Sequence, residues 1–195
     1  MSREEVYFFG KLSKSRDFIV SNNLEVDDKF FLDEWFGRCV GQNKLIPFAK
    51  KILAGSKIWL FVIKHSSYEN NVYIGLAALS LDKSGREYPF VLFCKSEFQN
   101  QSALLEKVEF ISSKIDFFQN ILNDGQCVLE DSFYNIDVEK DKKDEIGLKL
   151  VGNIAKYLSE RDGDIDSFWL ESNGAHFIEH QGSLSCSLFN KLFGS

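Results

Sequence analysis

Three apolar runs, separated by short polar segments, restrict how this chain can fold. They are Lys57–Ile63, Tyr73–Leu79 and Tyr88–Cys94, and runs of this length bounded by turn residues are typical of strands. Gly85 supplies the positive φ that a tight connection between the last two runs requires. Pro89 has no backbone donor, which places it in the first residues of its strand or at a sheet edge. The sequence therefore predicts an antiparallel meander of three strands.

Further elements follow from apolar periodicity and from residues that start or stop helices. The predicted strands outside the meander are Val6–Phe9, Asp166–Leu170 and Ala175–Glu179, and a polar loop over Lys11–Arg16 leads to the apolar segment Phe18–Val20. One predicted helix begins at Asp27 or Asp28 and carries Phe31, Trp35 and Cys39, and a short one follows Pro47 over Phe48–Leu53. A longer helix over Leu104–Leu122 is ended by Gly125. The last two predicted helices are Ile146–Leu158 and Ser183–Phe193. This alternation predicts an α/β fold, a sheet with helices on both faces.

The length of 195 residues suits one domain. We predict a single domain over residues 1–195 with a charged connection around residues 137–145. Val138 is the only strongly apolar residue of that connection, so we expect a solvated linker there.

Charge and hydropathy exclude several classes of partner. The net charge is −6, and Lys and Arg are interspersed with the acids, which argues against a nucleic-acid partner. Residues Met1–Glu5 carry acids where a signal peptide needs positive charge. No apolar stretch approaches the roughly 18 residues of a membrane span. We therefore expect a cytoplasmic protein without membrane insertion.

The cysteines and histidines show no pattern of a metal or redox site. The four cysteines are Cys39, Cys94, Cys127 and Cys186. They lie far apart and form no CxxC pair, so we expect buried free thiols in a reducing compartment. His176 and His180 would share a face only on a helix, and Asn173-Gly174 before them favours a strand after a turn. We expect no metal site and no cofactor.

Five charged residues of the first loop and of the Gly85 turn are candidates for a recognition patch. They are Lys11, Asp17, Asp82, Lys83 and Arg86. One interpretation is structural: Asp17 caps or bridges a loop, and Asp82 pairs with Arg86 to stabilise the hairpin. A second is a polar surface where an Arg fork binds a partner's carboxylate or phosphate. A third, an acid–base pair of Asp17 and Asp82, requires a pocket that separates their pKa values.

The large aromatic residues are interpreted as core. They include Trp35, Trp59, Trp169, Phe30, Phe31, Phe61, Phe117 and Phe118. An exposed subset would serve as a docking patch, because aromatic anchors are common in interfaces.

The chain resembles the TagF (also ImpM) family, which is associated with type VI secretion. The resemblance is carried by Gly10-Lys11-Leu12, Asp17-Phe18, Trp59 with Phe61, Asp82 with Gly85-Arg86 and Pro89, Trp169, and the terminal Leu188-Phe189 and Leu192-Phe193. Ser13 and Arg16 stand where the family usually has proline and glycine, and Lys83-Ser84 stands where it usually has arginine-valine.

This resemblance implies a cytoplasmic accessory protein that represses type VI secretion after translation. Its implied partners are a forkhead-associated scaffold protein or inner-membrane components of the system, and it is not known as an enzyme family. The implied fold is a three-layer α/β/α sandwich with a mixed, largely antiparallel sheet. Two alternatives stay open: a hydrolase or phosphatase that uses Asp17, Asp82 and Arg86, and a structural component of the secretion machine.

Overall fold

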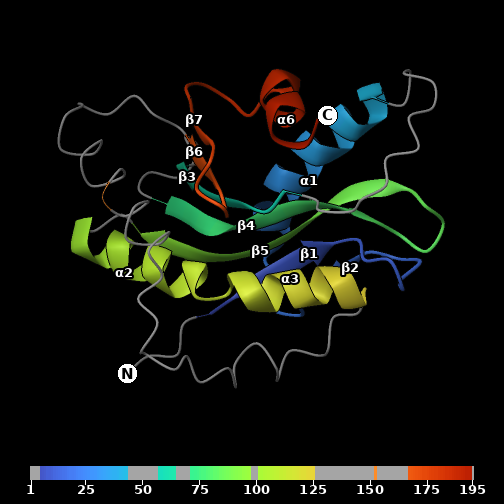
Figure 1. Cartoon of the computed structure of the whole chain (residues 1–195), viewed down its shortest axis with the longest axis horizontal. Helices are drawn as coiled ribbons and strands as arrows, with labels where there is room; N and C mark the ends of the chain where they lie inside the picture. Colours follow the sequence, from blue (N-terminus) through green and yellow to red (C-terminus); the bar gives the residue numbers. More distant parts are fainter. Residues whose placement is uncertain are drawn as a thin grey trace.

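A computed structural model describes residues 5–43, 57–64, 71–97, 101–125, 152 and 167–194. Their centre is an open sheet of seven strands in the order β2-β1-β5-β4-β3-β6-β7 (Figure 1). The strands are β1 (Tyr7–Gly10), β2 (Ile19–Val20), β3 (Trp59–Lys64), β4 (Asn71–Leu81), β5 (Glu87–Glu97), β6 (Ser167–Glu171) and β7 (Phe177–His180). Every pairing among these strands is antiparallel. The α/β class and the largely antiparallel sheet are thus as predicted, whereas the parallel pairing that a mixed sheet would need does not occur among the described strands.

The predicted meander is confirmed as β3-β4-β5, the middle of the sheet. Gly85 has a φ of 78°, as the turn between β4 and β5 requires. Pro89 is the third residue of β5 and lies opposite Leu79 of β4. The ladder between β5 and β1 begins only at Val91, so the missing N–H of Pro89 interrupts no pairing with β1.

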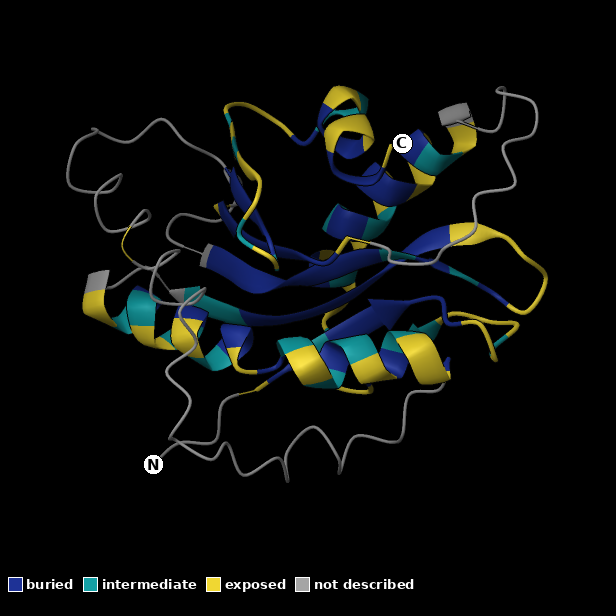
Figure 2. Cartoon of the chain, viewed as in Figure 1, coloured by how far each residue is buried: buried dark blue, intermediate teal, exposed yellow. Residues whose placement is uncertain are grey.

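Helices lie on both faces of the sheet (Figure 1). One face carries α2 (Gln101–Ser112) and α3 (Ile115–Asp124), and the other carries α1 (Val26–Asn43) and α6 (Cys186–Phe193). Alternate strand residues point to the two faces: Leu60 and Leu92 join the cluster under α2 and α3, while Phe61 and Phe93 join the cluster under α1 and α6. Burial is therefore nearly continuous along β3, β4, β5 and β6, as Figure 2 shows, because helices cover both sides.

The single helix predicted over Leu104–Leu122 is wrong, since α2 and α3 are separate. Ser112 Oγ donates to the carbonyls of Val108 and Glu109, and Ser113 Oγ donates to the carbonyl of Phe110. Such bonds compete with the helical ladder and bend or end a helix. The apolar spacing continues across the break, so periodicity alone did not reveal it. The predicted end at Gly125 is confirmed, because Gly125 caps α3 in the left-handed conformation.

The aromatic core is confirmed for most of the predicted residues. Trp35, Trp59, Trp169, Phe61 and Phe118 are buried. Phe31 and Phe117 are partly buried against the core, and Phe30 is wrong as a core residue, because its side chain is 63% exposed on α1. The helical spacing explains this, since the buried positions of α1 lie on the opposite face.

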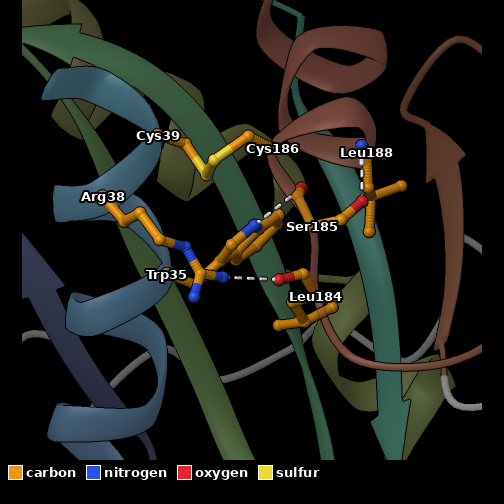
Figure 3. Close-up of a disulfide and its surroundings, with 7 residues drawn as sticks. All are labelled: Trp35, Arg38, Cys39, Leu184, Ser185, Cys186 and Leu188. Atoms are coloured by element: carbon orange, nitrogen blue, oxygen red, sulfur yellow. Dashed lines mark hydrogen bonds between the residues drawn. A yellow bond between two sulfur atoms is a disulfide. The ribbon is translucent and has the colours of Figure 1, made fainter. Parts of the chain in front are cut away.

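The prediction of free thiols is wrong for two cysteines. Cys39 of α1 and Cys186 of α6 form a disulfide, with Cα atoms 5.1 Å apart (Figure 3). They are 147 residues apart in sequence, and only the docking of α6 on α1 brings them together. Cys94 is a buried thiol, as predicted.

Hydrogen bonds also tie α6 to α1 beside this disulfide. Trp35 Nε1 donates to the carbonyl of Ser185 at 3.0 Å, and Arg38 Nη2 donates to the carbonyl of Leu184 at 3.0 Å (Figure 3). The Ser185 side chain caps α6 by accepting from the backbone N–H of Leu188. The last predicted helix is therefore capped by Ser185 and begins at Cys186.

Some predictions lie outside the described residues. These are the helices over 48–53 and 146–158, the charged connection around 137–145, and the state of Cys127. None of the helices in the described ranges is both long enough and apolar enough to cross a membrane.

Candidate functional site

The first loop, residues 10–18, lies against the β4–β5 turn and the start of β5, residues 82–89, and we call this contact the loop–turn joint. Gly10 begins it with a φ of 135°, a value that favours glycine. A Cβ at Gly10 would lie 2.3 Å from the carbonyl oxygen of Pro89 and 2.7 Å from the Cα of Phe90. The two most specific motifs of the sequence thus meet backbone to backbone, and only glycine permits their approach.

Asp82 is the centre of the joint. Its fully buried carboxylate accepts from Lys11 Nζ at 3.0 Å and from Arg86 Nε at 2.6 Å through Oδ2. Oδ1 accepts from the backbone N–H groups of Ser84 at 2.8 Å and Arg86 at 2.9 Å. Burial alone raises the pKa of Asp82, but the hydrogen bonds from Arg86, Lys11 and Ser84 outweigh it and hold the pKa well below its usual range. Asp82 is therefore ionised at any physiological pH.

Further hydrogen bonds join the loop to the turn on either side of Asp82. The N–H of Lys83 donates to the carbonyl of Ser15 at 2.9 Å, and Arg86 Nη2 donates to the carbonyl of Arg16 at 3.3 Å. The N–H of Lys14 donates to the carbonyl of Gly125 at 3.0 Å. The first loop is thus held between the turn and the end of α3.

An aromatic contact closes the joint on the face that carries α1. Lys11 Nζ lies 5.0 Å from the ring centre of Phe18, a cation–π distance. The Phe18 ring packs edge-on against Tyr88 with ring centres 4.8 Å apart. Burial raises the pKa of Tyr88, and its hydrogen bond to Asp33 of α1 raises it further. The joint is therefore continuous with the core under α1.

The five residues predicted as a patch fall into two groups. Lys11 and Asp82 are buried partners, whereas Asp17, Lys83 and Arg86 are exposed. The Asp82–Arg86 ion pair of the structural interpretation is present. What the structure offers to a partner is an exposed rim, which we define as Arg16, Asp17, Lys83 and Arg86. Recognition by this rim stays a prediction.

Two further polar clusters were not predicted. Glu171 is buried at the end of β6, where His176 and Lys57 approach its carboxylate, the latter at 3.6 Å. On the α1 face, the buried Asp28 accepts from the Tyr73 hydroxyl and pairs with Lys95 at 3.2 Å. Asp28, Tyr73 and Lys95 come from α1, β4 and β5, and Lys57 lies far from Glu171 in the chain, so no sequence spacing signals these contacts. Within the described ranges, no three His, Cys, Asp or Glu side chains are grouped as a metal ion would require.

Comparison with a solved structure supports the fold. The chain is similar to the crystal structure of PA0076 from Pseudomonas aeruginosa PAO1, with a TM-score of 0.55 and 19% identity over 97% of this chain and 94% of that chain. The likeness shows that the two share an α/β fold.

A family model that matches this sequence identifies the family. The model of the TagF N-terminal domain, type VI secretion system-associated, matches residues 7–129. The chain therefore belongs to the TagF family, and the matched segment contains the whole loop–turn joint. A search of curated proteins finds no match.

Proposed function

We propose that this protein is a cytoplasmic, post-translational negative regulator of type VI secretion that acts by binding another protein. The proposed partner is the forkhead-associated scaffold protein or an inner-membrane assembly component. The observation that carries the proposal is the match of the TagF domain to residues 7–129. We also infer a three-layer α/β/α arrangement for the whole chain, which the helices on both faces of the sheet support.

The loop–turn joint supports a binding role for its exposed rim. The Arg86 side chain is 55% exposed, while its Nε is held by buried Asp82. An oriented guanidinium loses less freedom when it binds a carboxylate or phosphate. Lys83 adds positive charge beside it, so we infer that the rim binds an acidic segment of the partner.

The same geometry supports a binding protein over a hydrolase or phosphatase. A general acid or base works best with a pKa near the operating pH. The contacts of Asp82 lower its pKa far from that range, and all of its donors serve to hold the turn. We therefore propose that Asp82 is a positioning residue and that the protein is not an enzyme.

The test is secretion of the type VI tube protein in the native host, after deletion and after overproduction of this chain. A repressor predicts raised secretion on deletion and loss of secretion on overproduction. Loss of secretion on deletion would instead identify a structural component, which would co-purify with the apparatus in fixed ratio. Unchanged secretion in both strains would contradict the proposal.

A charge reversal tests the rim without disturbing the buried ion pair. Lys83→Glu changes an exposed side chain, because only the backbone N–H of Lys83 bonds to Ser15. Lys191→Glu, on the exposed side of α6, is the matched control. We expect overproduced Lys83→Glu to repress secretion less than the wild type and the control to repress fully. Equal repression by both variants would exclude the rim.

A further inference from the structure

The Cys39–Cys186 disulfide joins the two helices that cover one face of the sheet, α1 and α6. Disulfides are rare in a reducing cytoplasm, and those found there are mostly transient bonds that act in catalysis or redox sensing. The cytoplasmic location proposed above therefore favours a bond that opens and closes over a permanent structural one. Three features of the bond bear on this distinction: access to the sulfur atoms, the reactivity of the thiols and the stability of the reduced form.

The two cysteines differ in their access to solvent. Cys39 is fully buried on α1, whereas Cys186 is partly exposed on α6. Figure 3 shows the two side chains directed toward each other, with Cys186 at the start of its helix. A disulfide is opened by a thiolate that reaches one of its sulfur atoms. A thiolate from solvent therefore attacks Cys186, and Cys39 is the leaving group.

The position of Cys186 makes its thiol a reactive one. Cys186 is the first residue of α6 and directly follows the capping residue Ser185. The backbone N–H groups at a helix N-terminus carry partial positive charge, which favours a thiolate over a thiol. A thiolate stabilised in this way attacks disulfides at neutral pH, and it also makes the reduced pair more stable. Cys39 lies in the interior of α1, away from the N-terminus of that helix.

Contacts other than the disulfide keep α6 on the sheet when the bond is open. The helix buries four apolar side chains, Leu188, Phe189, Leu192 and Phe193. Trp59 Nε1 donates to the carbonyl of Leu192 at 2.8 Å. The bonds from Trp35 and Arg38 to the segment before α6 are also independent of the sulfur atoms. The two thiols therefore stay close in the reduced protein, and the bond can form again.

The disulfide limits how far α6 can leave the sheet. The helix has only eight residues, and an isolated helix of that length is unstable in water. A crosslink restricts the open states of the segments that it joins, so its reduction increases local opening. Opening uncovers the rings of Trp35 and Phe36, whose centres lie 5.9 Å and 6.2 Å from that of Phe189.

We propose that Cys39 and Cys186 form a reversible redox latch that sets how firmly α6 covers this aromatic cluster. On opening, a glutathione thiolate attacks Cys186 Sγ, the S–S bond breaks, and its electron pair passes to Cys39 Sγ. A second glutathione thiolate displaces Cys186 from the mixed disulfide. Two glutathiones are thereby oxidised to glutathione disulfide, and their two thiol protons end on the cysteines. Closing is the reverse, with glutathione disulfide as the oxidant. The latch goes beyond the proposed function and takes only the cytoplasmic location from it.

The first experiment equilibrates the purified full-length protein at different ratios of reduced to oxidised glutathione. Iodoacetamide traps the free thiols, and mass spectrometry of tryptic peptides measures the fraction of Cys39 linked to Cys186. We expect the pair to pass from mainly disulfide to mainly dithiol within the series, with the same curve from either starting state. A link that persists at every ratio, forms at none, or does not form again after reduction would overturn the proposal.

The second experiment compares two matched single substitutions, Cys39→Ser and Cys186→Ser. The first leaves the thiol at the start of α6, and the second leaves the thiol inside α1. We expect glutathione disulfide to modify Cys186 at least about tenfold faster than it modifies Cys39. Circular dichroism checks that both variants fold. Equal rates, or a faster reaction at Cys39, would refute the order of attack on which the latch depends.

The third experiment needs no substitution, because it compares hydrogen exchange of the oxidised wild type with that of the wild type reduced by dithiothreitol. We expect the backbone amides of α6 to exchange at least about tenfold faster after reduction. Those of α3, on the opposite face of the sheet, should be accelerated less. Equal exchange of α6 in both states, or equal acceleration of α6 and α3, would show that the bond does not control local opening and would overturn the latch.

The last experiment traps the thiols in the native host before and after diamide, which oxidises cellular glutathione. We expect Cys39 and Cys186 mainly as thiols in growing cells and mainly as the disulfide after diamide; a link that does not respond would reject the latch. This outcome is separable from the proposed function. A responsive link with unchanged secretion on deletion would retain the latch and reject the repressor, and raised secretion on deletion with an unresponsive link would do the reverse.

Discussion

Replacing Asp82 with alanine removes the acceptor on which the loop–turn joint depends. In the wild type its buried carboxylate receives Lys11, Arg86 and two backbone N–H groups. After the substitution, Arg86 can be solvated because it is more than half exposed, whereas the Lys11 ammonium is left in a buried position. The energetic consequence therefore comes mainly from Lys11.

The magnitude follows from this unpaired buried cation. Removing one partner of a buried ion pair costs about 3–5 kcal/mol. Because water can solvate the exposed Arg86, we place the loss of unfolding free energy for Asp82→Ala at about 3 kcal/mol. For a domain of roughly this size, each kcal/mol lowers Tm by about 2–4 °C. We expect Asp82→Ala to lower Tm by about 6–12 °C.

Urea denaturation followed by circular dichroism measures this free energy of unfolding. Asp17→Ala is the matched control, because Asp17 is an exposed aspartate of the same candidate patch, and it should stay within about 0.5 kcal/mol of the wild type. Lys11→Met combined with Asp82→Ala should be more stable than Asp82→Ala alone, because no buried ammonium is left unpaired. Equal stability of Asp82→Ala and Asp17→Ala would refute the reasoning.

The same carboxylate predicts a pH dependence. The pKa of Asp82 in the folded protein lies below the value of about 3.9 that an unfolded aspartate has. Its stabilisation is therefore fully present above the unfolded pKa and is lost as the pH falls toward the folded pKa. We expect the difference between the wild type and Asp82→Ala to be constant above about pH 5 and to shrink below about pH 4. A difference that grows in acid would contradict this assignment.

Three further substitutions test the packing. Gly75→Ala should destabilise the protein by about 3 kcal/mol, because its Cβ would lie 2.6 Å from the Phe61 ring; wild-type stability in a denaturant titration would refute the contact. Cys39→Ser should lower the free energy of unfolding by about 2–4 kcal/mol without reductant. This difference from the wild type should largely disappear when dithiothreitol opens the bond to Cys186. A difference that dithiothreitol leaves unchanged would mean that the loss of stability has another cause. Gly37→Ala should stabilise the free protein by about 1 kcal/mol, since its Cβ meets nothing within 4 Å; a lower Tm would show that the position is not open.

The sheet could be predicted largely because its signals are local. The meander depends on apolar runs of strand length and on one turn, and Gly85 and Pro89 both take their expected roles. The last helix and the strand pair before it are also confirmed, as α6, β6 and β7. The break between α2 and α3 was missed, because serine hydroxyls that bond to the preceding turn leave the apolar spacing intact.

The candidate site was predicted in composition but not in geometry. Lys11, Asp82 and Arg86 do come together, yet which of them is buried depends on how the first loop lies against the turn. Burial makes Asp82 an internal partner and leaves Lys83 and Asp17 on the surface. The recognition role of the exposed residues stays a prediction.

By itself, the sequence determined most of the order of strands and helices, the turn at Gly85 and the family resemblance, because each is encoded by neighbouring residues. Only the tertiary structure decided which distant residues meet and which face of a helix is covered. The Cys39–Cys186 disulfide and the exposed Phe30 are examples. Both depend on how α1 and α6 pack on the sheet, and a residue's own neighbours in the chain carry no record of that docking.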